Sequence, residues 1–321
     1  MLRKGCTQSC ALDSSVPLQW RIAPWMAEFK SGFIALLGRP NVGKSTLLNA
    51  LVGEKIAIVS TKPQTTRSRI TGIKTVEEAQ LIFVDTPGLA RPRSALNRHM
   101  MQIARDAYQG VDLILLVTEA SGPEQLAADE FILQQLKDVK IPIFLVINKI
   151  DLIDHRQLLP LIETYQQQFP FAEYVPISAL KEVNTEALSR AIIRYLPAGP
   201  CLFPTDQLTD QPERFWIAEL IREQIFSLMS QEVPYQTAVL VEQMEDTDSG
   251  VLHVEATIYV ERDSQKGIII GKRGNRLKEI GQAARQEIER RLNTRVYLAL
   301  WVKVRKDWSE NEQLIRDMGY V

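Results

Sequence analysis

Hydrophobic residues come in short runs along the first 200 residues, and between these runs they recur at helical spacing. The runs are apolar on both faces of an extended strand, as in FIALLG and IPIFLVIN, whereas stretches such as EQLAADEFILQQL repeat at i, i+3 and i+4. Strands are predicted at residues 33–38, 69–76, 79–85, 111–119, 141–148 and 173–178. Helices are predicted at residues 45–53, 95–109, 124–136, 157–169 and 184–196. The alternation predicts an α/β domain over residues 31–197, with a mostly parallel sheet covered by helices on both faces.

The pattern changes after a segment rich in proline and turn-forming residues. Residues 198–212 read as an interdomain linker. The stretch Arg214–Ser230 then places its apolar residues on one helical face, and the strand pattern at Val251–Glu261 alternates apolar with more polar residues. The predicted element order is α-β-β-α-α-β. We therefore expect a second, α+β domain over residues 213–321, including a C-terminal tail.

The N-terminal segment, residues 1–30, has no clear periodicity and lacks the apolar core of a secretory signal. We expect a disordered extension. Since Met26 precedes the first strand by only a few residues, an upstream start-site artefact, a real extension and an organellar transit peptide all remain open.

The motif GRPNVGKST follows the first predicted strand and leads into a helix. Gly38 and Gly43 bracket a GxxxxGKS loop whose N–H groups can surround a phosphate at the positive end of the helix. Lys44 would neutralise the β- and γ-phosphates, and Ser45 would ligate Mg²⁺. The loop's nucleotide-binding residues are Gly38, Asn41, Val42, Gly43, Lys44, Ser45 and Thr46.

The choice of base follows from Asn148, Lys149 and Asp151, which come directly after a strand. The carboxylate of Asp151 can accept hydrogen bonds from both the ring N1–H and the exocyclic amine of guanine, whereas adenine offers neither donor there. The aliphatic stem of Lys149 can cover the base. One backbone N–H from Ser178, Ala179 or Leu180 can reach the guanine oxygen. The predicted nucleotide is therefore GTP or GDP.

Two further segments have the character of nucleotide-sensing loops. In DTPG, Asp85 would reach Mg²⁺ through water, and the N–H of Gly88 would sense the γ-phosphate. The segment 62–67 is polar and aperiodic, so Thr66 is assigned as the threonine that completes the Mg²⁺ site, with Thr65 as the alternative. The predicted metal ligands are Ser45, Thr66 and Asp85. Leu89 follows the motif, and its side chain cannot polarise water.

In this order, GRPNVGKST, PQTTR, DTPG, NKID and SAL resemble the GTPases of the Era, MnmE and EngA branch over residues 31–197. The resemblance implies slow intrinsic GTP hydrolysis, in which switch-loop backbone positions the water. It also implies that Asn41 helps to hold K⁺ where other systems use an arginine finger. The candidate catalytic residues are Lys44, Thr66, Gly88 and Asn41. A domain that binds GTP without hydrolysing it is the alternative.

The second domain carries a GxxG loop, Gly271-Lys272-Arg273-Gly274, between its two later helices. With the element order above, this resembles a type II KH domain, whose loop clamps about four nucleotides of single-stranded RNA. The three isoleucines before the loop would supply apolar floor or core. The candidate RNA-binding residues are Gly271, Lys272, Arg273, Gly274, Ile268, Ile269, Arg276 and Lys278. An ordinary solvated helix face is the alternative for Arg276 and Lys278.

Charge is concentrated in the region of this loop. The whole chain carries a net charge of −1, yet residues 262–306 hold 13 Lys and Arg against 4 Asp and Glu, which is +9 there and −10 elsewhere. Three cysteines and three histidines are too few for a disulfide framework or a structural zinc site. No apolar run approaches the ~20 residues that span a bilayer, although peripheral membrane contact stays open.

A phosphate-loop GTPase domain followed by a KH domain resembles the Era family, and the segments PTDQLTDQPERF and WVKVRKDWSENEQLI extend that resemblance to the C-terminus. It implies a GTPase that binds ribosomal RNA near the 3′ end of the small-subunit RNA and acts in assembly of the small subunit. A constitutive RNA-binding protein with a nucleotide-sensing domain is the alternative. We expect a cytoplasmic protein, peripheral at the inner membrane surface if it contacts membranes, or organellar if the extension is a transit peptide.

Overall fold

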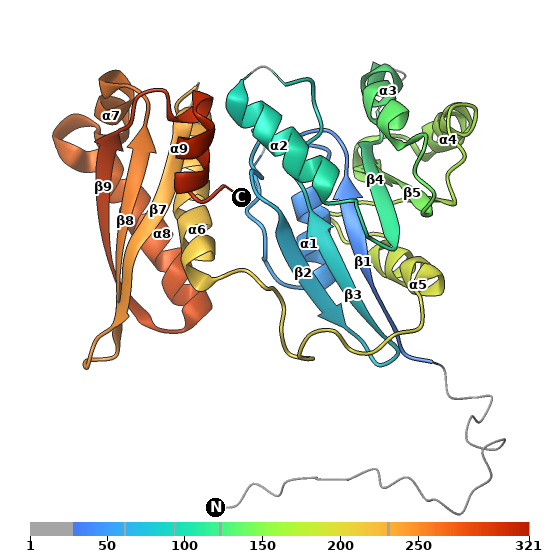
Figure 1. The fold of residues 1–321 in the computed structure, drawn as a ribbon, viewed down its shortest axis with the longest axis horizontal. Helices are drawn as coiled ribbons and strands as arrows, with labels where there is room; N and C mark the ends of the chain where they lie inside the picture. Colours follow the sequence, from blue (N-terminus) through green and yellow to red (C-terminus); the bar gives the residue numbers. More distant parts are fainter. Residues whose placement is uncertain (1–27, 61, 93, 122–123, 230–231, 321) are drawn as a thin grey trace, which may run out of the picture.

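The computed structural model describes residues 28–320, except 61, 93, 122–123 and 230–231, and it contains two sheets in two neighbouring domains (Figure 1). The expectation for the N-terminal extension lies almost wholly outside the described residues, although its last residue, Lys30, is the first residue of β1. Among the described residues, no helix is long and apolar enough to span a lipid bilayer.

The first domain is built on a six-stranded sheet in the order β2-β3-β1-β4-β5-β6. All neighbouring pairs are parallel except β2 with β3, so the mostly parallel sheet expected from the sequence is confirmed. The strands are β1 (Lys30–Leu37), β2 (Ile70–Thr75), β3 (Ala79–Asp85), β4 (Leu113–Glu119), β5 (Ile143–Asn148) and β6 (Glu173–Pro176).

Helices cover both faces of this sheet, which is why its central strands are buried on both sides. Helices α1 and α5 pack on one face, and α2, α3 and α4 pack on the other. Their bounds are α1 (Lys44–Val52), α2 (Ala95–Asp106), α3 (Glu124–Leu136), α4 (Leu158–Gln166) and α5 (Thr185–Tyr195). The loops at the carboxyl ends of the parallel strands therefore meet at one edge, the usual ligand-binding edge of such sheets.

The second domain has the predicted α-β-β-α-α-β order, extended by a short C-terminal helix. Its sheet has the order β7-β8-β9, with β8 and β9 parallel and β9 at the free edge. Helices α6, α7 and α8 pack on one face of the sheet. The bounds are α6 (Glu213–Leu228), β7 (Thr237–Asp246), β8 (Val251–Val260), α7 (Asp263–Ile270), α8 (Asn275–Leu292), β9 (Arg295–Val304) and α9 (Glu312–Asp317).

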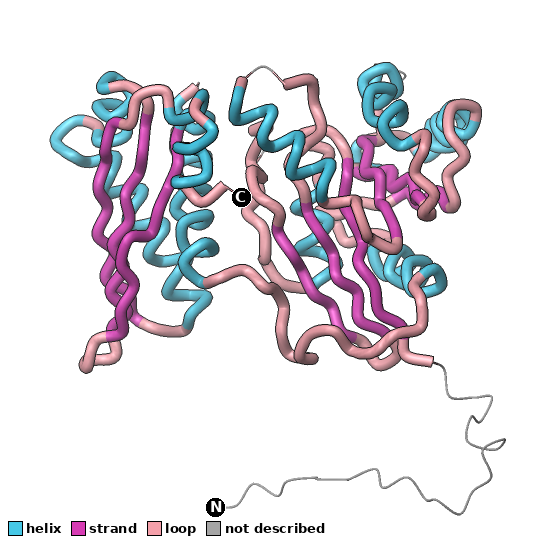
Figure 2. Tube along the Cα trace, in the orientation of Figure 1, coloured by secondary structure: helices cyan, strands magenta, loops and turns pink. Residues whose placement is uncertain are grey.

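The segment between the domains is fixed along the edge of the first sheet (Figure 2). Gln80 of β3 accepts hydrogen bonds from the N–H groups of Leu202 (2.8 Å) and Phe203 (2.9 Å). Farther along, Ile73 N donates to Leu208 O (2.8 Å) and Thr209 Oγ1 donates to Thr71 O (2.6 Å), both at edge strand β2. The sequence predicted a linker here, and the structure shows a packed segment.

A small hydrophobic cluster joins the two domains. Residues of α2 in the first domain, including Leu96 and Met100, pack against Trp308, Ile315 and Tyr320 of the C-terminal segment. Helices α2 and α9 accordingly face one another across the domain boundary (Figure 1).

Candidate GTP and RNA sites

The phosphate loop lies between β1 and α1 at the carboxyl edge of the first sheet. Gly43 begins the helix with φ +96°, and a β-carbon on it would lie 2.3 Å from Asn148 Nδ2, so only glycine fits. That amide donates a hydrogen bond to Val42 O (2.8 Å). The phosphate loop is thereby fixed to the start of the NKID motif, although the two are separated by about a hundred residues.

Lys44 is the buried cation of the loop. Its ammonium donates hydrogen bonds to the carbonyls of Gly38 (3.0 Å) and Arg39 (2.9 Å). Burial lowers its pKa to about 8, while the nearby Asp85 carboxylate opposes the shift. An anion placed in the loop would restore the charged form of Lys44, which is the electrostatic requirement of a phosphate site.

The three predicted magnesium ligands converge. Ser45 Oγ lies 2.7 Å from Asp85 Oδ2 and 2.8 Å from Thr66 Oγ1, and Thr66 Oγ1 lies 3.4 Å from the same carboxylate oxygen. The other oxygen, Asp85 Oδ1, is buried with no hydrogen-bond partner among the described residues. Burial also raises the pKa of Asp85, against Lys44 and the hydrogen-bond donors. A cluster of hard oxygen ligands with one unpartnered carboxylate oxygen fits Mg²⁺.

Of the two candidate threonines, the structure places Thr66 in this cluster. The hydroxyl of Thr65 instead donates to the carbonyl of Lys62 at 2.8 Å.

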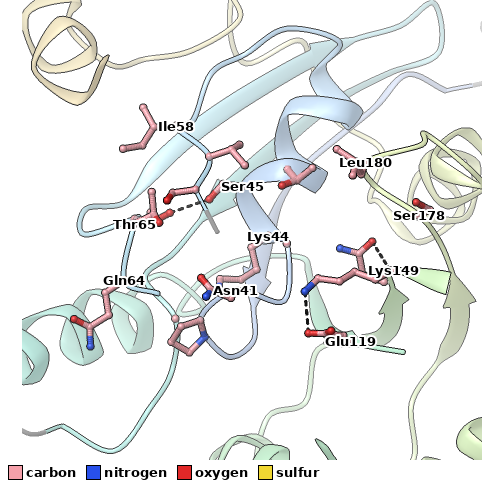
Figure 3. A pocket seen from close by; sticks show the side chains of 18 of the residues that line it. Asn41, Lys44, Ser45, Ile58, Gln64, Thr65, Glu119, Lys149, Ser178 and Leu180 are labelled. Carbon is pink, nitrogen blue, oxygen red and sulfur yellow. Dashed lines mark hydrogen bonds and ion pairs between the residues drawn. The ribbon is translucent and has the colours of Figure 1, made fainter. Parts of the chain in front are cut away.

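A cavity of about 570 Å³ joins the phosphate loop to the predicted base site. Figure 3 shows Lys149 and Leu180 on one side of it and Thr65 on the other. The predicted residues that line it are Asn41, Gly43, Lys44, Ser45, Thr46, Thr66, Gly88, Asn148, Lys149, Asp151, Ser178 and Leu180. Gly38, Val42, Asp85 and Ala179 are not part of its lining.

Asn148 organises the base side of the cavity. Its Oδ1 accepts hydrogen bonds from the N–H groups of Lys149 (2.8 Å) and Ala179 (2.9 Å). The Ala179 N–H, one of the three predicted donors to guanine, is therefore bonded to Asn148 in this state. Lys149 pairs with Glu119 across 2.8 Å, a contact that the sequence analysis missed, and Asp151 is exposed to the cavity.

The DTPG loop lies against the phosphate loop. A β-carbon on Gly88 would stand 2.5 Å from Pro40 N, so the two backbones are in close contact. Leu89 N donates to Gly38 O at 3.0 Å, and the Leu89 side chain is buried in the hydrophobic core. The leucine side chain therefore packs in the core, and it offers no group that could polarise a water molecule.

A buried polar cluster holds Arg39 of the phosphate loop against α3. The sequence did not reveal this cluster. The carboxylate of Asp129 on α3 is fully buried and accepts hydrogen bonds from Arg39 Nε (2.7 Å), Thr118 Oγ1 (2.6 Å) and Tyr165 Oη (2.7 Å). Burial, followed by the Asp129 charge, raises the pKa of the Tyr165 phenol and keeps it a donor. Asp129 lies within an amphipathic helical pattern, where an acidic residue ordinarily faces solvent.

Residues 62–67, here called the switch segment, contact α6 of the second domain. Arg222 is almost wholly buried, pairs with Glu219 and donates to the carbonyl of Thr65. The neighbouring Glu223 accepts a hydrogen bond from Val59 N (3.1 Å) and pairs with Lys55 (2.6 Å). The predicted Thr66 ligand thus follows a residue whose backbone is held by the other domain.

Arg67 makes the deepest contact between the domains. Its guanidinium is 2% exposed and donates to the carbonyls of Thr237 (2.7 Å), Tyr235 (2.8 Å) and Pro234 (3.0 Å) in the second domain. It also donates to Tyr320 Oη at 3.2 Å, and burial lowers its pKa. No sequence pattern predicts these partners, because backbone carbonyls are present at every residue and carry no side-chain signal.

The GxxG loop forms a short 3₁₀ turn, Lys272–Gly274, between α7 and α8. The side chains of Lys272, Arg273, Arg276 and Lys278 are exposed, and a groove of about 450 Å³ includes Lys272 and Arg276 in its lining but not Lys278.

The prediction of two RNA-facing isoleucines before the loop needs one correction. Ile268 lines the groove and is 44% exposed, but Ile269 is fully buried in the domain core. Consecutive residues of a helix point about 100° apart, so both cannot lie on the RNA face. Farther along α8, Arg290 and Arg291 contact Glu287, and Arg291 also covers the Trp216 ring, which gives Arg291 a structural role.

Comparison with known proteins identifies both domains. The profile of a family described as "50S ribosome-binding GTPase" matches residues 33–149, and that of the KH domain matches residues 232–309. A crystal structure of an Era variant from Aquifex aeolicus bound to GDP and AlF₄⁻ is 43% identical, with a TM-score of 0.87, over 91% of this chain and 100% of that chain. A second, of Era with MgGDPNP and nucleotides 1506–1542 of 16S ribosomal RNA, is 44% identical, with a TM-score of 0.88, over 91% and 99%. The chain belongs to the Era family of GTPases.

Proposed function

We propose that this protein is a GTP-hydrolysing switch that binds small-subunit ribosomal RNA through its KH domain and acts in maturation of the small ribosomal subunit in the cytoplasm. One observation supports coupling between the nucleotide site and the RNA-binding domain. The switch segment supplies Thr66 to the Ser45 and Asp85 cluster and is bonded to the second domain through Thr65 and Arg67. A change at the nucleotide can therefore change the contact with the RNA-binding domain.

In this proposal Lys44 binds the β- and γ-phosphates, and Asp151 reads the guanine edge. Ser45, Thr66 and Asp85 would hold Mg²⁺, which neutralises phosphate charge when bound. Asn148 positions both halves of the site, because it bonds to the phosphate loop and to the segment that begins at Ser178. The relatives bound to GDP with AlF₄⁻ and to MgGDPNP support this assignment.

For hydrolysis, we propose that Asn41 helps to hold K⁺ and that backbone groups near Thr66 and Gly88 orient the water. The buried Leu89 supports a mechanism without a glutamine side chain at that position. GTP turnover measured in K⁺ and in Na⁺ at equal ionic strength tests this. We expect a higher rate in K⁺ that Asn41→Ala reduces, and equal rates in both salts would refute the K⁺ assignment.

For RNA, we propose that the protein recognises a single-stranded segment near the 3′ end of the small-subunit RNA. The relative crystallised with nucleotides 1506–1542 of 16S RNA supports this choice. The exposed Lys272 and Arg273 between the loop glycines would meet its phosphates, and Ile268 and Arg276 would line the groove beside them.

The decisive experiment replaces Lys272 and Arg273 by Asp. The change reverses two charges beside RNA phosphates, so RNA binding should collapse, whereas RNA-free GTP hydrolysis should persist. Lys137→Asp with Lys140→Asp makes the same change in charge at exposed residues just after α3, and serves as the matched control. If the folded Lys272 and Arg273 double variant bound the 16S segment as tightly as the unchanged protein, the GxxG assignment would be wrong.

The alternative, a constitutive RNA-binding protein, predicts that RNA affinity is the same with GDP and with a non-hydrolysable GTP analogue. The bonds from Arg67 to Thr237 and from Arg222 to Thr65 favour the coupled protein, because they join the switch segment directly to the second domain. Titrating RNA against each nucleotide complex separates these two functions.

A further inference from the structure

The outward face of the second sheet is unevenly covered. Helices α6, α7 and α8 pack on its inner face, and the C-terminal segment with α9 covers the β7 side of the outer face (Figure 1). Strand β9 forms the free edge, on the side away from the first domain. Its inward residues Val296 and Val302 are buried, so the residues between them in alternation face outward.

Two large aromatic side chains stand on this open edge. Tyr297 is 59% exposed and Trp301 is 57% exposed, and both belong to the outward-facing set of β9. Tyr297 contacts the ring of His253 on β8, with 4.8 Å between centroids. Trp301 stands beside Thr257 in the same pairing register. The two aromatics are four positions apart in the strand, which is about 13 Å along it.

Positive charge surrounds the pair. From Arg295 to Lys306 the chain carries four cationic residues and no acidic residue. Lys303 pairs with Glu242 across 3.4 Å, whereas within the described part of the chain no carboxylate makes an ion pair with Arg295 or Arg305. On β8, Glu255 is the acidic neighbour between the two aromatics, opposite Ala299. Glu245 of β7, opposite His253, is a second acidic residue on this face, so the positive charge that can meet an anionic ligand lies at Arg295 and Arg305.

The edge is also adjacent to the GxxG groove. Helix α7 ends at the loop and packs against β9, and α8, which begins there, packs so close to β9 that a β-carbon on Gly281 would lie 3.4 Å from the side chain of Leu300. A nucleic-acid strand leaving the groove therefore needs only to cross the free edge of the sheet to reach the two aromatic rings.

We propose that Tyr297 and Trp301 form a second RNA subsite, on which unpaired bases of the same single strand stack after it leaves the GxxG groove. The proposal rests on the RNA-binding function proposed above and extends it to the opposite face of the sheet. Aromatic rings stack on any base and cations track the backbone, so this subsite adds affinity with little sequence preference. The GxxG loop clamps about four nucleotides, and the subsite engages those beyond it.

The test compares an RNA of four nucleotides with one of sixteen, measured by fluorescence anisotropy on the full chain. Tyr297→Ala and Trp301→Ala should each weaken binding of the longer RNA about tenfold and leave the tetranucleotide unchanged. Trp301→Phe should keep most of the affinity, because a phenyl ring still stacks. Leu159→Ala, which removes a 70% exposed side chain from the first domain, is the control.

Salt dependence separates stacking from charge. The aromatic variants should keep the slope of affinity against salt, whereas Arg295→Ala with Arg305→Ala should reduce it. The Lys272 and Arg273 double variant should lose both RNAs, so failure of the KH assignment is distinguishable from failure of this subsite. Unchanged affinity of the Tyr297 and Trp301 double variant for the longer RNA would overturn the proposal. If that variant also lost binding to intact small subunits, the face would be a protein-docking surface.

Discussion

Arg67→Ala should loosen the contact between the two domains while leaving each domain folded. The side chain donates three hydrogen bonds to backbone carbonyls of the second domain and is 2% exposed. Removing it leaves those carbonyls without their donor inside a dry interface. The first domain keeps its own core, because the residues that fill the two faces of its sheet are not touched.

The magnitude follows from the number and kind of these bonds. A hydrogen bond from a charged donor contributes about 1.5–3 kcal/mol, and the lower end applies here because burial also disfavours the guanidinium charge, as its lowered pKa indicates. Three such bonds give about 4.5 kcal/mol of docking free energy. The equilibrium between docked and undocked domains should shift about a thousandfold towards undocking.

Scanning calorimetry and small-angle scattering would measure this. We expect the unchanged protein to unfold in one coupled transition, and Arg67→Ala to give two transitions and a more extended particle. Arg69→Ala is the matched control, because Arg69 lies two residues away and is exposed. If Arg67→Ala behaved as Arg69→Ala does in both measurements, the hydrogen bonds of Arg67 would not hold the domains together.

Three further predictions concern the nucleotide site. Asp151→Asn should shift preference from guanine towards xanthine nucleotides, since an amide can donate to the xanthine oxygen; unchanged GTP affinity by calorimetric titration would exclude this role. Burial lowers the Lys44 pKa to about 8, and bound phosphates favour its charged form, so GTP binding should take up a proton and should weaken as the pH rises through 8. Equal binding heats in buffers of different ionisation enthalpy would refute this proton uptake. In urea denaturation, Asp129→Asn should lower the free energy of unfolding by about 3 kcal/mol and Tyr165→Phe by only about 1 kcal/mol. Equal losses would show that Arg39 is not the main partner of the Asp129 carboxylate.

The local features of the nucleotide site could be predicted from the sequence because each depends on a short stretch of backbone. The left-handed φ of +96° at Gly43 belongs to the GxxxxGKS loop itself, whereas the hydrogen bond from Asn148 to Val42 joins segments about a hundred residues apart and was not predicted. The error at Ile269 has a different origin. Three consecutive isoleucines do not reveal which one faces the core, and the rotation of α7 is set by its packing on the sheet.

The contacts between the domains could not be predicted, because they form only when segments far apart in the chain meet. Arg222 lies on α6 beside two other buried charged residues, Glu219 and Glu223, and it is buried because the switch segment covers it. The same holds for Asp129, whose partners come from the phosphate loop, β4 and α4. When a charged side chain is paired with residues far away in the chain, the hydrophobic periodicity of the sequence does not show it.

The fixed interdomain segment limits how far the second domain can travel. Because Thr209 is bonded to β2, only residues 210–212 separate that anchor from the start of α6. Three extended residues reach about 10 Å. An undocked KH domain therefore remains at high effective concentration near its docking surface, and redocking is an intramolecular event that does not depend on protein concentration. The segment therefore acts as a pivot. An RNA bound to the second domain can change its orientation during the nucleotide cycle while it stays close to the first domain.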